Sequence, residues 1–184
     1  MAAKLAGDVV LLDCGAYTAN VFRLHNGTFN PADLPIASIQ NGGGNPHIRM
    51  PLLEWVQSGG GDLTAVTVDD IDRVIRLGSV SGDYKLTFGR SEVDLKQMLD
   101  YQSHQYADWL ANNALDTRFD GLRDISALLI IGGNAPHVLP FLKTWYPDKV
   151  IEYTGWREFA RLHPADLNAA GSIRLALARQ KQGK

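Results

Sequence analysis

Residues that could bind a phosphate and a metal ion gather in one short stretch near the amino terminus, DCGAYT. Asp13 offers a carboxylate and Thr18 a hydroxyl, while Gly15 allows the backbone to turn and to come close to a ligand. Because Gly15 and Ala16 are small, the backbone N–H groups of this turn are open to an anion, and the carboxylate could hold a metal ion or a water molecule. Asp, Gly and Thr are also ordinary turn residues, so a plain β-turn is the alternative.

Two expected strands position this turn. Residues 9–12 form a continuous apolar run, as in a strand that is covered on both faces, and this strand ends at Asp13. Residues 18–24 mix apolar and polar side chains, as in a strand nearer the edge of a sheet. The pattern therefore predicts a β-hairpin with residues 14–17 at its tip.

A second glycine-containing turn follows another apolar strand candidate. Residues 124–131, DISALLII, predict a buried strand that runs through Gly132, Gly133 and Asn134 into a helix. The apolar face of that helix comprises Val138, Leu139, Leu142 and Trp145. A strand that passes through two glycines into the start of a helix exposes backbone N–H groups and places no side chain in the way of a ligand. A tight turn without a ligand is the alternative.

The rest of the chain predicts further strands and helices around these turns. Apolar spacing predicts a helix from Asn45 or Pro46 to just before Gly59, and Ser91 with its acidic neighbours predicts the start of a longer helix that ends near Asn113. An aromatic stripe on the longer helix is typical of core packing. The other expected elements are short strands at residues 36–40 and 149–153, a strand at 64–68 followed by a short helix or strand from Asp69, and a hairpin at 79–89. Residues 156–162 are expected to be irregular or helical, and residues 167–180 to form a helix.

Composition indicates one globular domain that binds neither nucleic acid nor a membrane directly. The 184 residues are 45% hydrophobic and 21% charged with a net charge of −2, so no global charge attracts nucleic acid or an anionic membrane. No apolar run approaches the ~18 residues of a membrane span, and the amino terminus lacks the apolar core of a signal peptide. We therefore expect a cytoplasmic protein.

The sequence offers little for nucleophilic or zinc chemistry. Cys14 is the single cysteine, which excludes an internal disulfide and fits a reducing compartment. No neighbouring histidine supports a catalytic thiol, so we expect a small residue that simply fits the turn. The five histidines form no pair at helical spacing and have no cysteine partner, so no zinc site is expected.

Three motifs, in this order, resemble those of the actin-like ATPase superfamily, which contains actin, heat-shock chaperones and sugar kinases. DCGAYT at residues 13–18 resembles its second phosphate loop, IIGGNA at 130–135 resembles its adenosine motif, and LNAAG at 167–171 resembles its connector helix. The sequence resembles in particular the carboxy-terminal half of bacterial plasmid-segregation proteins of the ParM/StbA type. The resemblance implies an α/β, ribonuclease-H-like fold whose mixed sheet begins with three antiparallel strands and carries helices on both faces.

The resemblance also implies how the chain is divided. Residues 1–184 correspond to a single domain, the second half of a two-domain fold, with a variable insert at about residues 62–90 that forms an outer subdomain. Because the nucleotide of the superfamily lies in a cleft between the two halves, this chain provides one wall. We expect an excised or truncated half of a longer ATPase, which hydrolyses ATP only when the first domain is present. A natural half-length protein that regulates a full-length partner is the alternative.

Each residue of the two turns acquires a role from the resemblance. Asp13 would hold Mg²⁺ through water or orient the attacking water, and the phosphates of ATP or ADP would be bound by Gly15, Ala16, Tyr17 and Thr18. The ribose and adenine would lie against Gly132, Gly133 and Asn134. Four residues depart from the family pattern: Ala16 and Tyr17 replace glycine or small hydroxyl residues, Asn134 replaces a glycine, and Leu167 replaces an alanine.

For the whole protein, the resemblance implies an ATP-binding filament protein that segregates plasmid DNA or serves a bacterial cytoskeleton. Its expected partners are further copies of itself, the first domain or a full-length homologue, and a DNA-binding adaptor. Two alternatives stay open. One is a nucleotide-independent adaptor or assembly protein in which Tyr17 blocks the phosphate site, and the other is a small-molecule kinase of the same superfamily.

Overall fold

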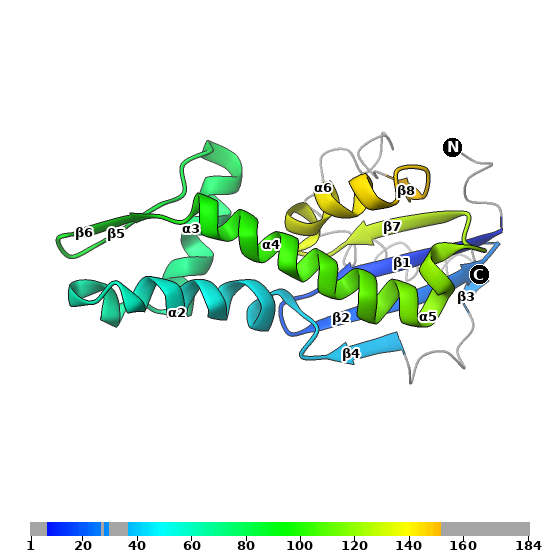
Figure 1. Ribbon diagram of the computed structural model, residues 1–184, viewed down its shortest axis with the longest axis horizontal. Helices are drawn as coiled ribbons and strands as arrows, with labels where there is room; N and C mark the ends of the chain where they lie inside the picture. The colour runs from blue at the N-terminus through cyan, green and yellow to red at the C-terminus, as the bar shows by residue number, and fades with distance from the viewer. Residues whose placement is uncertain (1–6, 27, 30–36, 152–184) are drawn as a thin grey trace, which may run out of the picture.

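The computed structural model describes residues 7–26, 28–29 and 37–151. A six-stranded sheet has the order β3-β2-β1-β7-β8, with β4 paired to β2 (Figure 1). Its strands are β1 (Asp8–Cys14), β2 (Thr18–His25), β3 (Thr28–Phe29), β4 (Ser38–Gln40), β7 (Ala127–Ile131) and β8 (Val150–Ile151). Strand β1 is antiparallel to β2 and parallel to β7, so the sheet is mixed, as predicted.

The central position of β1 brings the two predicted turns together. Asp13 is paired with Asn20 of β2 on one side and with Ile131 of β7 on the other. Because β1 and β7 are parallel, both strands end at the same edge of the sheet. The turn that follows Asp13 and the glycines that follow Ile131 are therefore neighbours in space.

Side chains of β1 alternate between the two faces of the sheet, and both faces are covered. Val10 and Leu12 are fully buried in the main core, which also contains the buried residues of the long helices. Val9 belongs to a smaller cluster on the other face, with Ala127 and Ile151. The apolar run of β1 thus contributes to two cores, which explains why it does not alternate with polar residues.

Helix α4 (Lys96–Leu110) connects two parts of the molecule (Figure 1). It packs against α6 (Ala135–Trp145) and continues into the π-helical turn η5 (Ala111–Asp116). We call the six-stranded sheet, α6 and the short helices α5 (Thr117–Phe119) and η6 (Asp120–Leu122) the sheet region. We call residues 50–94 the outer region, because they extend beyond the end of the sheet, at the left of Figure 1.

The outer region is a continuous segment of chain that follows the π-helical turn η3 (Asn45–Arg49). Its elements are α2 (Met50–Ser58), the 3₁₀ turn η4 (Gly61–Ala65), α3 (Val68–Ser81), and the two-stranded sheet of β5 (Lys85–Phe88) and β6 (Ser91–Asp94). A capping box starts α3, since Thr67 and Asp70 each accept a hydrogen bond from the other's backbone N–H. Gly82 ends the helix in a left-handed conformation, with φ of 79°.

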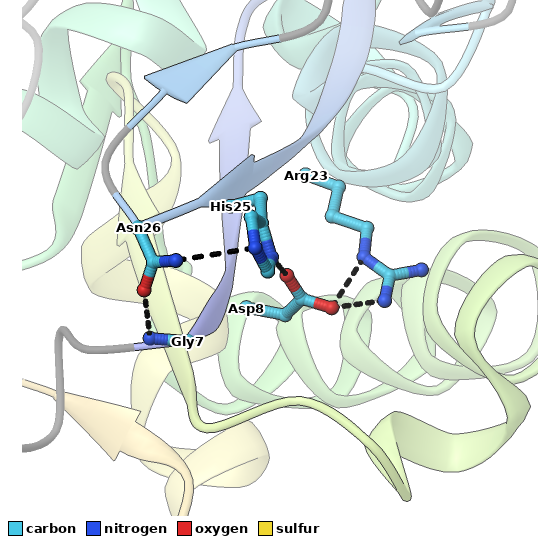
Figure 2. Close-up of polar contacts among 5 residues, drawn as sticks. All are labelled: Gly7, Asp8, Arg23, His25 and Asn26. Carbon is cyan, nitrogen blue, oxygen red and sulfur yellow. Dashed lines mark hydrogen bonds and ion pairs between the residues drawn. The ribbon is translucent and has the colours of Figure 1, made fainter.

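A polar cluster joins β1 to β2 at the end of the hairpin opposite the candidate turn (Figure 2). Asp8 accepts hydrogen bonds from Arg23 and from Nδ1 of His25, and the His25 contact is 2.5 Å. Asn26 completes the cluster, because its Nδ2 lies 3.1 Å from Nε2 of His25 and its Oδ1 accepts a hydrogen bond from the N–H of Gly7. These contacts hold β1 and β2 in register far from the candidate site.

Three predictions for the outer region are wrong. Residues 64–68 form no strand: Thr64 lies in η4, where its hydroxyl donates to the carbonyl of Gly61, and Val68 begins α3. The hairpin predicted at 79–89 lies instead at 85–94, because α3 continues to Ser81. Residues 91–94, predicted as a helix start, form β6, in which Val93 pairs with Leu86, and α4 begins only at Lys96.

Several predictions for the remaining chain are confirmed. The α/β class with antiparallel strands first is as expected, and so are the helix that starts at Asn45 and the buried strand before Gly132. The strand predicted at 36–40 corresponds to β4, which is shorter than expected. The two-residue strand β3 had not been predicted. The segments predicted at 156–162 and 167–180, with the LNAAG motif, lie outside the described residues. Among the residues described, no helix is both long and apolar enough to cross a membrane.

Candidate functional site

The turn between β1 and β2 exposes backbone N–H groups. The N–H of Gly15 donates to the carbonyl of Thr18 at 3.0 Å and closes the turn. Ala16 and Tyr17 are exposed, and within the described part of the chain no hydrogen bond has their N–H groups as donor. Two such adjacent donors are suited to an anion, as the sequence predicts.

The carbonyl groups of Gly15, Ala16 and Tyr17 accept hydrogen bonds from the end of a glycine run, residues 42–44, and from the first residue of η3. Gly43 donates to Tyr17 at 3.2 Å, Gly44 to Gly15 at 2.9 Å and Asn45 to Ala16 at 2.7 Å. Because these carbonyls are occupied, the turn offers donors rather than acceptors to a ligand. Glycine is needed for this close approach, since a Cβ on Gly43 would lie 2.4 Å from the carbonyl oxygen of Ala16.

Buried Tyr106 and half-buried His47 fix the position of the glycine run. The hydroxyl of Tyr106 donates to the carbonyl of Gly42 at 2.8 Å, and burial raises the pKa of Tyr106, so this hydroxyl stays protonated. The ring of His47 stacks on Tyr106 with centroids 5.2 Å apart, and its Nε2 lies 3.1 Å from the carbonyl oxygen of Asn41. Tyr106 belongs to the aromatic stripe for which the sequence predicts core packing, and its burial confirms this, but the sequence gives no sign of the polar contact with Gly42.

The turn between β7 and α6 lies against the end of β1. Gly132 has a φ of 93°, and a Cβ there would lie 2.5 Å from a carboxylate oxygen of Asp13 and 2.6 Å from the carbonyl oxygen of Cys14. Only glycine fits this position. The turn continues through Gly133 and Asn134 into α6, and the N–H of Ala135 donates to the carbonyl of Gly132 at 3.1 Å. The predicted site residues therefore lie in two adjoining turns.

Asn134 is a structural link between the two turns. It is 1% exposed, and its side-chain Nδ2 donates to the carbonyls of Gly15 at 2.7 Å and Cys14 at 3.3 Å. Its Oδ1 accepts a hydrogen bond from Nη1 of Arg49 at 2.7 Å. The predicted contact between Asn134 and a nucleotide stays a prediction, but the side-chain amide already binds the protein on both sides.

Asp13 and Cys14 differ in what they offer to chemistry. Asp13 is partly buried at the end of β1 and is the carboxylate nearest to Gly132. The described residues contain no group of three or more His, Cys, Asp or Glu side chains that could hold a metal. A single carboxylate still suits Mg²⁺, which takes most of its ligands from phosphates and water. Cys14 is fully buried, and burial raises the pKa of its thiol, which disfavours the reactive thiolate.

Tyr17, the bulky departure from the family pattern, turns its side chain to solvent. The residue is 71% exposed, so the ring does not fill the space between the two turns. Gly43, Gly44, Arg49 and Tyr106 support the site but were not among the predicted site residues. The glycine run was visible in the sequence, whereas its contact with the first turn depends on tertiary structure alone.

Comparison with known proteins rests on structure, since no protein-family model and no curated protein matches the sequence. A 15-stranded ParM filament from Clostridium botulinum is similar with a TM-score of 0.67 and 18% identity over 95% of this chain and 47% of that chain. An archaeal actin homolog is similar with a TM-score of 0.62 and 16% identity, over 88% of this chain and 44% of that chain. Bacillus thuringiensis ParM with ATP is similar with a TM-score of 0.61 and 15% identity, over 93% of this chain and 48% of that chain.

The chain has an actin-like fold. This confirms the fold and the likeness to ParM proteins expected from the three motifs. The chain spans less than half the length of these three solved structures. In the described residues, the candidate phosphate turn and the glycine-containing βα turn lie at the same edge of the sheet.

Proposed function

We propose that this chain is the second, nucleotide-binding half of an actin-like ATPase that assembles into filaments, in plasmid or other DNA segregation or in a bacterial cytoskeleton. The observation that carries the proposal is the β1–β2 turn, whose carbonyls bind residues 43–45, while no hydrogen bond within the described chain has the N–H groups of Ala16 and Tyr17 as donors. Support comes from similar structures that are a ParM filament and a ParM with ATP.

Each group at the sheet edge has a part in binding ATP or ADP. The N–H groups of Ala16 and Tyr17 and the hydroxyl of Thr18 bind phosphate oxygens, and the ribose and adenine lie against the βα turn of Gly132 and Gly133, where α6 begins. Asp13 would help to hold Mg²⁺, through water, or would orient the attacking water. Bound Mg²⁺ supplies positive charge that neutralises the phosphates.

Hydrolysis and assembly require more than this chain. The nucleotide has only one wall here, so turnover depends on a first domain or on a full-length homologue. Copies of the complete protein associate into filaments, and a DNA-binding adaptor connects them to their cargo. The isolated half therefore binds nucleotide weakly and hydrolyses it poorly or not at all.

Calorimetric titration of the 184-residue chain with Mg-ATP tests the proposal. We expect measurable binding that is weakened by Asp13→Ala and by Thr18→Val, which removes a hydroxyl but keeps a branched side chain. Asp108→Ala, which removes an exposed carboxylate from α4, is the matched control and should leave binding unchanged. Robust ATP turnover by the isolated chain would contradict the two-walled site.

The protein joined to its first domain tests the role of Asp13. Here Asp13→Ala should abolish hydrolysis while the circular dichroism spectrum and the melting temperature stay close to those of the unchanged protein. Unchanged ATPase activity in this folded variant would show that Asp13 does not act on the metal or on the water.

A second candidate, a nucleotide-independent adaptor, is favoured by the position of Asn134. Its side chain lies between the two turns where the resembled motif has a glycine, and it is bonded on both sides. A chain that binds no nucleotide, alone or joined to its first domain, but forms a stable complex with a partner would favour this function.

A further inference from the structure

Arg49 is a nearly buried cation between the candidate site and the outer region. It is the last residue of η3, and its side chain is 11% exposed. Its Nη1 donates to Oδ1 of Asn134 at 2.7 Å, and its Nε donates to Oδ1 of Asp72 at 2.7 Å. One guanidinium therefore bonds the βα turn on one side and helix α3 on the other.

The charge of Arg49 determines how the amide of Asn134 is oriented. A guanidinium can only donate hydrogen bonds, so the amide oxygen must face Arg49 and the amide nitrogen must face the opposite way. There the nitrogen donates to the carbonyls of Gly15 and Cys14, which belong to the β1–β2 turn. Arg49 thus acts on the candidate phosphate turn through Asn134.

Gly44 leaves the space that this arrangement needs. A Cβ on Gly44 would lie 2.3 Å from the side-chain atoms of Asn134, and the N–H of Gly44 itself donates to Gly15. The Asn134 side chain, the glycine run and the turn are therefore packed as one unit.

Asp72 extends the same connection into the outer region. Its second carboxylate oxygen lies 3.0 Å from Nε of Arg76, four residues further along α3. Arg76 is mostly exposed, with 74% of its side chain accessible, whereas Arg49 is shielded from water. The Arg49–Asp72 bond is therefore the stronger of the two contacts to this carboxylate.

We propose that Arg49 is a positioning residue for the nucleotide site: it holds Asn134 against the β1–β2 turn and, through Asp72, couples that turn to helix α3. The coupling to nucleotide rests on the proposed function, because it requires that a ligand binds the turn. A ligand that orders the turn then also reduces the motion of α3. Loss of Arg49 loosens the turn and separates it from α3.

Amide hydrogen exchange on the ligand-free chain tests the first half of the inference, independently of nucleotide. In Arg49→Gln, the N–H groups of Gly44 and Asn45, which donate to the turn, should exchange about tenfold faster, the equivalent of one hydrogen bond. Arg76→Gln is the matched control and should leave their exchange unchanged. Unaltered exchange in Arg49→Gln would overturn the positioning role, whatever the chain binds.

Titration with Mg-ATP, combined with exchange of α3, tests the coupling. Arg49→Gln should weaken binding on the order of tenfold, as substitutions of outer partners of a binding site do. Asp72→Asn should leave the affinity nearly unchanged but remove the protection of α3 that nucleotide produces in the unchanged chain. Arg49→Lys keeps the positive charge and should restore the affinity in part. The restoration is incomplete because one ammonium group cannot bond Asn134 and Asp72 in the geometry of the guanidinium.

The outcomes separate this inference from the proposed function. If the unchanged chain binds no Mg-ATP while Arg49→Gln accelerates exchange at the turn, the proposed function fails and the positioning role stands. If Mg-ATP binds equally well to the unchanged chain and to folded Arg49→Gln, the coupling is wrong and the nucleotide site stands. Protection of α3 that persists in Asp72→Asn also contradicts the coupling.

Discussion

The sheet region and the outer region are built by different kinds of contact. In the sheet region, β1 pairs with β7 from a distant part of the sequence, and the candidate site lies where these two strands end. The outer region is a continuous segment whose elements follow one another along the chain, from α2 to β6. The comparison teaches that the site depends on long-range pairing, whereas the outer region is linked to it by the ion pair between Asp72 and Arg49.

The largest expected effects come from removing a buried leucine in each region. Leu128 of β7 and Leu86 of β5 are 0% and 1% exposed and belong to the same core cluster. Leu128→Ala and Leu86→Ala should each lower the free energy of unfolding by about 3 kcal/mol. Because the core is continuous, urea unfolding followed by circular dichroism and by tryptophan fluorescence should show a single transition. Two separate transitions in Leu86→Ala would mean that the outer region unfolds alone.

Two glycines with positive φ, one in each region, provide a second contrast. Gly132→Ala should cost about 3 kcal/mol, because a backbone of φ 93° and a clash with Asp13 and Cys14 act together. Gly82→Ala should cost only about 1 kcal/mol, since its φ is 79° but a Cβ there meets nothing within 4 Å. Equal melting temperatures for the two variants would show that the packing around Gly132 is not as tight as described.

The helix cap of the outer region gives a smaller effect. Thr67→Ala removes the side chain that accepts from the N–H of Asp70 and should lower stability by about 1 kcal/mol. Thr67→Ser keeps the hydroxyl and serves as the matched control, with nearly unchanged stability. Nucleotide binding should stay the same in both variants, because the capping box makes no contact with the candidate site. A loss of binding in Thr67→Ala would mean that the two regions are coupled more widely than through Arg49.

Acid stability gives the smallest expected difference between the regions. Hydrogen bonds from Arg23 and His25 lower the pKa of Asp8 in the sheet region, and hydrogen bonds from Thr67 lower the pKa of Asp70 in the outer region. A carboxyl whose pKa is lower in the folded state stabilises the protein above its unfolded pKa of about 4, and this contribution disappears as the pH falls through the folded pKa.

Asp8→Asn and Asp70→Asn should therefore each reduce the loss of stability below about pH 4. Denaturant midpoints measured between neutral pH and acid pH would show this. A pH profile unchanged in Asp8→Asn would mean that the cluster in Figure 2 does not perturb that carboxyl in solution.

Local patterns predicted the sheet region well and the outer region poorly. The apolar runs of β1 and β7 are a specific signal for buried strands, because a strand buried on both faces needs an unbroken series of apolar residues. Residues 64–68 contain threonine and valine, which are typical of strands. Thr67 nevertheless caps α3 together with Asp70, and these local hydrogen bonds start a helix where the residue types favour a strand. Ser91 and its acidic neighbours fit a helix start equally well, yet Val93 pairs with Leu86 and forms a hairpin.

By itself, the sequence determined the chemistry at the sheet edge: a carboxylate at Asp13, a small turn at Gly15 and a glycine at position 132 where no side chain fits. Backbone preference and side-chain size are local properties, so they can be read from residue types. Only the tertiary structure decided that Gly44 and Arg49 support this turn through Asn134. Those contacts join residues from separate parts of the chain, and their partners are set by how the strands and helices pack, which no local pattern encodes.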